Sequence, residues 1–535
     1  MKHYLRLITV ASALSVSLAS CVQDLNTEPI DPKIIQTFNQ DEVYYKIYAG
    51  LGTSGLKGPN GDNGDDTDIV TDNEGYSVFY RVLFVHEEFP TDAGWWIWND
   101  PGVPDLLECK WTAENSFTSM LYNRLEFNVT NCNHFLENTK DKTDAKSLQQ
   151  RAEIRFLRAL NYYYLMDLFG NPPFSTAVSV QKPSQKEGGR PALYAWLVDE
   201  LKAAENDLQE RSAAGLYRVN KDDARLLLAR PYLNAEVYTG TPAWSDAETY
   251  AKKITGAYTL APNYAELFMG DNDVNSAAGE IIFSIPQDGN MIQSWGASTA
   301  IVCMARGAGM QPWGSTDMWE CWRSTPELLN VFISKEDRAA ANIKANEKQM
   351  PALLGDDRAL FCSYSTNATG EIFEATDAGG AGYGTGNFQK CWAIAKWTGV
   401  YSDGSNGKHT QFVDTDVPFF RAGEAFLTYA EALYRQGKTT EALDILNSSI
   451  RSRAHAAALT EINDDVLLDE WQREFYCEGR RRIDLIRFGQ FVGPTATRKW
   501  EGHSKSSYNK KYLLYPIPNS DCVANPNLTQ NDGFN

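Results

Sequence analysis

The sequence predicts a mainly α-helical protein in which tetratricopeptide-like helix pairs support a loop-rich half with short strands. Three observations indicate this fold class. Long stretches carry apolar residues at helical spacing. A central region consists of short apolar runs broken by glycine, which is typical of loops and short strands. Two of the helical stretches also resemble each other, as the units of a helical repeat do.

The N-terminus has the parts of a bacterial lipoprotein signal peptide. A basic start precedes an apolar run at residues 7–18, which is too short to span a bilayer, and small residues stand directly before Cys21. We expect residues 1–20 to be removed, Cys21 to carry the lipid and residues 21–40 to form a tether to a membrane. The alternative is a buried amphipathic first helix with a chance cysteine.

Residues 41–535 are expected to form one domain. The helical-repeat scaffold is placed at about 120–268 and 419–491, and the loop-rich binding parts at about 52–115 and 270–415. Helical periodicity is strong in residues 144–169, 192–209, 221–238, 246–255, 420–436, 440–453 and 465–487.

Two helix pairs within this scaffold look alike. Residues 228–235 with 247–251, and residues 425–432 with 442–443, alternate small residues with leucine and tyrosine. Such residues allow paired helices to approach closely and stack. Ordinary antiparallel helices in an α-rich core are the alternative.

Composition excludes several classes of protein. Hydrophobic content of 43% and aromatic content of 12% exclude general disorder. A net charge of −19 argues against nucleic acid as a partner, because a polyanion would be repelled. The nine cysteines contain no C-x-x-C, which fits neither a zinc ribbon nor a dense disulfide scaffold.

A tryptophan-rich tract at residues 94–100 is the candidate binding site. Sugar rings present apolar C–H faces and hydroxyl edges, so a sugar site needs flat aromatic rings beside hydrogen-bonding side chains. If the tract is extended, Trp96 and Trp98 point to one side as an exposed stacking surface, while Trp95 packs inward. The alternative is that all three rings belong to the core.

Enzyme signatures are missing from the sequence. Neither G-x-S-x-G nor H-E-x-x-H occurs, and the six histidines are dispersed. A glycosidase needs two facing carboxylates, but with 69 acidic residues the abundance of candidates carries no weight.

An acidic loop resembles part of a calcium site. Asp271, Asp273 and Asn275 have the spacing of the first ligands of an EF-hand, but Ser276 and Ile282 stand where that loop needs glycine and glutamate. An EF-hand is therefore excluded. An isolated calcium site with a distant carboxylate and a solvated acidic turn are the two remaining interpretations.

Several blocks in order along the chain resemble the SusD-like (RagB/SusD) glycan-binding lipoproteins of the outer membrane. The blocks are residues 151–159 (RAEIRFLRA), 167–170 (DLFG), 473–475 (REF), 478–482 (EGRRR), 484–489 (DLIRFG), 515–518 (YPIP) and 525–534 (NPNLTQNDGF). The resemblance implies helix pairs supporting a loop-rich binding half, no catalytic activity, no required cofactor, and a SusC-like TonB-dependent outer-membrane transporter as partner. It also implies a lipid-anchored location at the outer membrane, facing the cell surface.

Further details resemble a starch-binding member of that family and imply starch-like α-glucan or maltooligosaccharides as ligand. The implied glycan-binding residues are Arg81, Trp96, Trp98, Trp295, and either Asn99 or Asp100. The implied calcium ligands are Asp273 and Asp414. A helical-repeat scaffold that binds only proteins and a glycoside hydrolase are the alternative functions.

Overall fold

The computed structural model describes residues 38–53, 68–69, 77–98, 100–179, 181–292, 314, 321–341, 343–363, 392–493, 496 and 509–534. Contacts within the chain divide it into a short unit, Met1–Val43, and a large unit, Tyr44–Asn535. The predicted signal peptide and Cys21 lie outside the described residues. The following account concerns the large unit.

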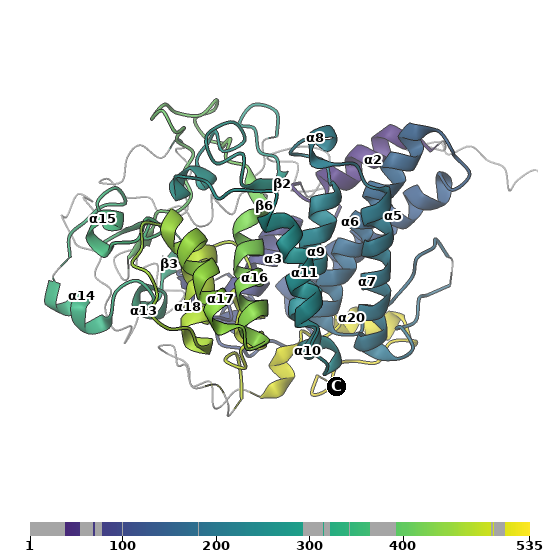
Figure 1. Ribbon diagram of the computed structural model, residues 1–535. Helices are drawn as coiled ribbons and strands as arrows, with labels where there is room; N and C mark the ends of the chain where they lie inside the picture. The colour runs from purple at the N-terminus through teal and green to yellow at the C-terminus, as the bar shows by residue number, and fades with distance from the viewer. Residues whose placement is uncertain are drawn as a thin grey trace, which may run out of the picture. The chain divides into compact units, whose positions relative to one another are not determined.

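Long helices form the scaffold of this unit, and their axes run roughly side by side in Figure 1. Along the chain α5 packs against α6, α6 against α7, α7 against α9, α9 against α11, α11 against α16, and α16 against α17. The two similar helix pairs of the sequence, α9 with α11 and α16 with α17, are therefore neighbours. The scaffold helices are α5 (Ser116–Asn138), α6 (Ala145–Phe169), α7 (Gly189–Asp207), α9 (Lys221–Leu233), α11 (Trp244–Thr255), α16 (Ala422–Arg435) and α17 (Thr439–Leu446).

Local sequence explains where the longest scaffold helix begins and ends. The Asp144 carboxylate accepts a hydrogen bond from the backbone N–H of Ser147 at 3.0 Å, which satisfies a free donor of the first turn of α6. The helix ends at Gly170, whose φ of 75° suits glycine. The predicted helix at 144–169 is confirmed within one residue.

Two predicted helices are interrupted. The stretch 221–238 is divided at Asn234 into α9 and α10 (Ala235–Thr239), three residues after Pro231, which cannot donate a backbone hydrogen bond. The stretch 465–487 is divided into α18 (Asp464–Phe475) and α19 (Arg481–Arg487). Between them Cys477 and Gly479 have φ of 59° and 74°, which no right-handed helix accommodates.

The predicted short strands form two antiparallel arrangements among the described residues. One has the order β1 (Gly94–Trp96), β3 (Trp322–Ser324), β5 (Ala393–Ile394) and β4 (Phe361–Cys362). The other pairs β2 (Ile281–Ile285) with β6 (Val417–Arg421), and β6 leads directly into α16. The mainly α fold with a loop-rich part and short strands is confirmed.

Shorter elements complete the described chain. They are α2 (Gln40–Ala49), α3 (Phe79–Glu88), α4 (Val103–Leu107), α8 (Arg211–Ala214), η3 (Tyr264–Phe268), α13 (Pro326–Asn330), α14 (Lys335–Ala341), α15 (Met350–Leu354), the π-helical turn η4 (Asn447–Arg451), η6 (Lys510–Leu513) and α20 (Asn519–Ala524).

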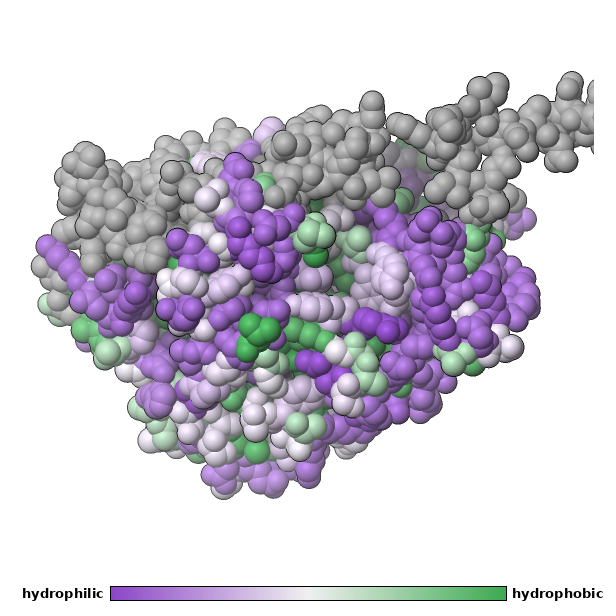
Figure 2. All heavy atoms as spheres, turned by 90° about the horizontal axis from the view of Figure 1, so that it is seen from above, coloured by the Kyte–Doolittle hydropathy of each residue, from purple (hydrophilic) through white to green (hydrophobic). Residues whose placement is uncertain are grey.

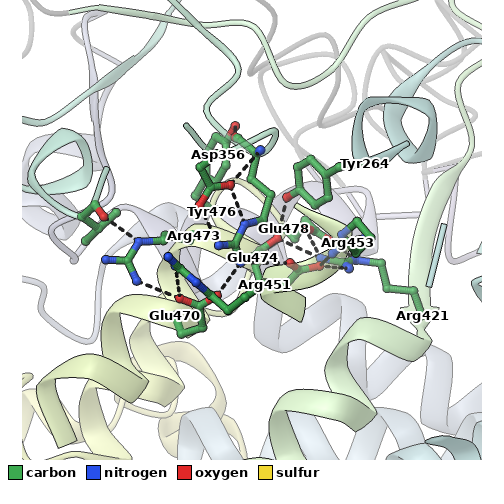
Figure 3. Close-up of polar contacts among 12 residues, drawn as sticks. Tyr264, Asp356, Arg421, Arg451, Arg453, Glu470, Arg473, Glu474, Tyr476 and Glu478 are labelled. Carbon is green, nitrogen blue, oxygen red and sulfur yellow. Dashed lines mark hydrogen bonds and ion pairs between the residues drawn. The ribbon is translucent and has the colours of Figure 1, made fainter. Parts of the chain in front are cut away.

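A buried network of arginines and glutamates joins β6 to α18 (Figure 3). Arg421, at the end of β6, is 1% exposed, and its Nη1 lies 2.9 Å from Glu280 Oε1 and 2.7 Å from Glu474 Oε1. Its Nη2 lies 2.7 Å from Glu478 Oε1. Because each of these carboxylates also faces other cations, the network is a continuous set of charge-assisted hydrogen bonds.

The same network continues through Glu470 and Glu474 on α18. Arg358 Nη1 lies 2.7 Å from Glu470 Oε1 and 3.3 Å from Glu474 Oε2. Arg451 and Arg473 approach the second oxygen of Glu470 at 3.0 and 2.8 Å. The loop-borne Arg358 is thereby fixed to a helix more than a hundred residues later in the chain.

On the face drawn in Figure 2, most of the coloured residues are hydrophilic. Figure 2 shows one face on which apolar side chains occur in small, separate groups. Among the described residues, no helix combines the length and the hydrophobicity needed to cross a bilayer.

Candidate functional site

The tryptophan tract begins in strand β1 and continues as a loop. Trp95 and Trp96 pair with Arg323 and Trp322 of β3, and the Ile97 N–H donates to the Cys321 carbonyl at 3.0 Å. Gly94 is required here because a Cβ at this position would collide with the indole ring of Trp322 and lie 2.8 Å from the Arg323 carbonyl oxygen. The backbone of the tract is thus fixed against β3.

Trp96 and Trp98 meet edge to face. Their ring centroids are 5.8 Å apart with an interplanar angle of 82°, so the two rings do not form one flat surface. Trp96 also contacts Phe89 at 5.2 Å, and its Nε1 donates to Asp100 Oδ2 at 2.5 Å. The structure therefore brings together Trp96, Trp98 and Asp100.

Exposure differs between the two tryptophans. Trp96 is only 3% exposed, similar to Trp95 at 5%, whereas Trp98 is partly exposed. The expectation that Trp96 presents an open stacking face is wrong for this structure, because β3 and Phe89 enclose it. Trp98, with Asp100 beside it, is the accessible part of the tract.

Arg81 lies on α3, the helix that leads into the tract, and is 2% exposed. Trp295 and Asn99, the other predicted contacts, lie outside the described residues. The prediction that either Asn99 or Asp100 is the polar contact therefore stays open.

Sequence reasoning missed Trp322, which organises the aromatic rings behind the tract. Trp322 is fully buried, pairs with Trp96, and stacks on Phe89 with centroids 4.8 Å apart and an interplanar angle of 12°. The short strand that carries it gives too weak a periodic signal to be assigned to β1 from sequence.

Two consecutive glutamates at the end of α3 are buried beside the tract. Glu88 Oε1 accepts hydrogen bonds from the backbone N–H groups of Gly479 and Arg480, at 2.9 and 3.1 Å. Burial raises the pKa of Glu88 to about 7, although these N–H groups and the Arg481 charge oppose the increase. Burial and the nearby charge of Asp167 likewise raise the pKa of Glu87.

Asp414, the predicted partner of the acidic loop, makes several hydrogen bonds. Asp414 uses its carboxylate to hold the surrounding loops, since it accepts from the N–H groups of Gly289 and Lys408 at 2.8 and 2.7 Å and from the Tyr401 hydroxyl at 3.1 Å. Asp416 likewise accepts from the Gln287 N–H, at 2.7 Å, and it is linked to Asp273 through the hydroxyl of Tyr217.

Tyr217 lies between these two carboxyl groups. Its hydroxyl donates to Asp273 Oδ2 at 3.1 Å and also adjoins Asp416. Burial raises the pKa of Asp416 to about 7, and the charge of Asp273 contributes to the increase. The described residues contain no cluster of three or more histidine, cysteine, aspartate or glutamate side chains arranged to hold a metal ion.

The protein is therefore helix-rich, and its candidate binding site lies on a short strand and the loop that follows it. Known structures share this fold. A SusD-like carbohydrate binding protein from Bacteroides fragilis has a TM-score of 0.67 at 20% identity, over 92% of this chain and 98% of that one. Surface glycan-binding protein A from Bacteroides thetaiotaomicron, in complex with laminarihexaose, has a TM-score of 0.64 at 19% identity, over 92% of this chain and 98% of that one.

The sequence comparisons identify the family. The family model described as the SusD family matches residues 279–534. The starch-binding protein SusD of Bacteroides thetaiotaomicron is 39% identical over 552 aligned residues, which cover 98% of this chain and 97% of that protein. SusD-like protein P25 of Formosa agariphila is 23% identical over 76% of this chain and 77% of its own length. The chain belongs to the SusD family, and the predicted resemblance is confirmed.

Proposed function

We propose that the protein is a non-catalytic, lipid-anchored binder of oligosaccharides at the outer membrane, and that starch-like α-glucan is its ligand. The observation that carries this proposal is the 39% identity, over 98% of the chain, to a protein named for starch binding. The tract supports it because Trp98 is a partly exposed aromatic ring in contact with Trp96, and Asp100, which accepts from Trp96 Nε1, places a carboxylate in the same group, as a sugar ring and its hydroxyl groups require.

Glycan titrations test the ligand class. We expect the protein lacking residues 1–21 to bind maltohexaose more tightly than laminarihexaose in isothermal titration calorimetry, without release of reducing sugar. Trp98→Ala should weaken binding roughly tenfold, since ring stacking contributes about 1 kcal/mol beyond area burial. Trp244→Ala removes another partly exposed tryptophan, at the start of α11, and is the matched control.

Other results would contradict the proposal. Release of reducing sugar would indicate a glycoside hydrolase, and the absence of binding to any glucan would favour the protein-binding scaffold. Tighter binding of laminarihexaose than of maltohexaose would support a glycan-binding function but contradict α-glucan as the ligand.

Membrane attachment and delivery to a SusC-like TonB-dependent transporter belong to the same proposal. Cys21→Ala should move the protein from the membrane fraction to the soluble fraction, because lipid on Cys21 is the proposed anchor. Copurification of a TonB-dependent barrel from native membranes tests the partner; a purified native protein without one would argue against it.

The resemblance implies calcium at Asp273 and Asp414; we propose Asp416 as the second carboxylate, because Tyr217 links the carboxyl groups of Asp273 and Asp416. Calcium should then raise the melting temperature relative to a chelator, since a ligand that binds only the folded state stabilises it. Asp416→Asn should abolish this increase. Asp414→Asn is the contrasting variant, because loss of a loop-holding carboxylate lowers the melting temperature while the response to calcium remains.

A further inference from the structure

The glycan-binding tract depends on a second segment of the chain for its position. Residues 478–483, which run from the break after α18 into the first turn of α19, contact the end of α3 and the turn before β1 at several points. These contacts join parts of the chain that are 389 residues apart at the Asp92–Arg481 pair.

The strongest of these contacts is a bidentate ion pair. Arg481 Nε lies 2.6 Å from Asp92 Oδ1, and Arg481 Nη2 lies 2.8 Å from Asp92 Oδ2. The two side chains are 3% and 6% exposed, so the pair is shielded from solvent. A guanidinium fork fixes both the distance and the orientation of a carboxylate, which a single point charge cannot do.

Asp92 is also tied to the strand that pairs with the tract. Its backbone carbonyl accepts a hydrogen bond from the Thr325 hydroxyl, directly after β3. Only Ala93 separates Asp92 from Gly94, the first residue of β1. The Arg481 guanidinium therefore holds the point from which Trp95, Trp96 and Trp98 extend.

The backbone of the same segment holds the helix before the tract. Glu88 accepts from the N–H groups of Gly479 and Arg480, and Glu87 accepts from the Ile483 N–H at 3.2 Å. The N–H groups of Gly479 and Arg480 are available because the chain is not helical there, where Gly479 has a φ of 74°, and the Ile483 N–H is available because it lies in the first turn of α19. The interruption of the predicted helix thus has a use at the site.

We propose that Arg481 is a positioning residue for glycan binding, which acts on the tryptophan tract through its bidentate pair with Asp92. This inference rests on the proposed glycan-binding function. Residues 478–483, which contain three arginines, would then hold the binding tract in position in addition to stabilising the fold.

Arg481→Lys tests the proposal because lysine keeps the charge and loses the bidentate geometry. The matched control is Arg487→Lys. Arg487 is on the same helix, is 4% exposed, and makes an equivalent two-point pair with Glu431 at 2.8 and 2.9 Å, among residues of the helical scaffold. Both variants lose the same type of interaction, so a general loss of stability affects them alike.

We expect Arg481→Lys to weaken glucan binding roughly tenfold, because a site whose support is loosened loses stacking and hydrogen-bond geometry together. Arg487→Lys should lower the melting temperature to a similar extent and leave the affinity unchanged. Equal affinities in the two variants would overturn the proposal.

A second measurement does not need a ligand. In protein labelled with 5-fluorotryptophan, the ¹⁹F resonance of Trp98, assigned from Trp98→Phe, should shift or broaden in Arg481→Lys but not in Arg487→Lys. An unchanged resonance overturns the positioning role even if glycan binds. If the wild-type protein binds no glucan, the proposed function is overturned. The ¹⁹F measurement still tests whether Arg481 positions Trp98.

Discussion

Two buried regions of the molecule use the same residue type in opposite ways. In the network of β6 and α18, Glu470 and Glu474 face several arginines. Burial alone would raise the pKa of Glu470, but the charges of Arg358, Arg473 and Arg451 outweigh it and lower the pKa to about 2. At the end of α3, backbone N–H groups are the hydrogen-bond donors to Glu88, and burial prevails, with a pKa of about 7.

Burial does not by itself decide the charge of a glutamate. A guanidinium in direct contact stabilises the ionised carboxylate, whereas one or two backbone dipoles compensate for only part of the lost hydration. Glu470 and Glu474, whose pKa values are both lowered, are therefore ionised at neutral pH. The support of the tryptophan tract contains a carboxyl that changes its charge near neutral pH.

The largest expected effect comes from removing a charge from the network. Glu474→Gln leaves Arg421, Arg453 and Arg358 buried with one carboxylate fewer, and we expect a loss on the order of 3–5 kcal/mol in the free energy of unfolding. Urea denaturation followed by circular dichroism measures this loss. Glu441→Gln, at an exposed site on α17, is the control. Equal denaturation midpoints for the two variants would show that the network does not stabilise the fold.

The next effect concerns the aromatic core of the tract. Because Trp96 is enclosed by Phe89 and β3, Trp96→Ala should cost about 3–5 kcal/mol of stability, as for other truncated buried tryptophans. Trp98→Ala, in the same tract but partly exposed, should cost clearly less. Thermal melts of both variants measure this difference. If Trp96→Ala is as stable as Trp98→Ala, the prediction from the sequence that Trp96 presents an open stacking face is supported.

The smallest expected effect is a difference between the two regions in how their glutamates make stability depend on pH. The folded-state pKa of Glu88 is raised, so its contribution to stability is fully present below its ordinary pKa and is lost as pH rises through about 7. For Glu470 the pKa is lowered, so its contribution is present above the ordinary value and is lost as pH falls towards 2. The combined contribution of these two glutamates to stability should therefore be greatest near pH 5.

Glu88→Gln tests the upper limb of this profile. Between pH 5 and pH 8 the wild type should lose at least about 1.4 kcal/mol more stability than the variant, since one unit of pKa shift corresponds to that amount. Melting temperatures measured across this range supply the answer. Parallel profiles would mean that Glu88 is ionised in the folded protein at both values.

Much of the helical scaffold could be predicted from the sequence because its signals are local. Apolar spacing and the Asp144 cap act within a few residues, and they located α6 within one residue of its observed bounds. The break between α18 and α19 was not predicted, because apolar spacing continues across it. Positive φ at Cys477, a residue type that rarely adopts it, depends on the surrounding packing.

The sequence predicted which residues form the tract of the candidate site, but not how their side chains are arranged in space. The sequence identified Trp96, Trp98 and Asp100 as neighbours, since they are adjacent in the chain. It could not show that Trp96 is enclosed, because the enclosing Trp322 comes from a strand far along the chain. For the same reason, the sequence could not show that Tyr217 links the carboxyl groups of Asp273 and Asp416.

The sequence by itself determined the helix-rich fold class, most helix positions and membership of the SusD family, all of which follow from periodicity and from motifs in linear order. Only the tertiary structure decided which tryptophan is accessible, which buried glutamates are ionised, and which arginine holds the tract. These properties depend on distances between residues hundreds of positions apart, such as Asp92 and Arg481, and on the loss of hydration when they meet. Such distances are set by how the helices and strands pack together.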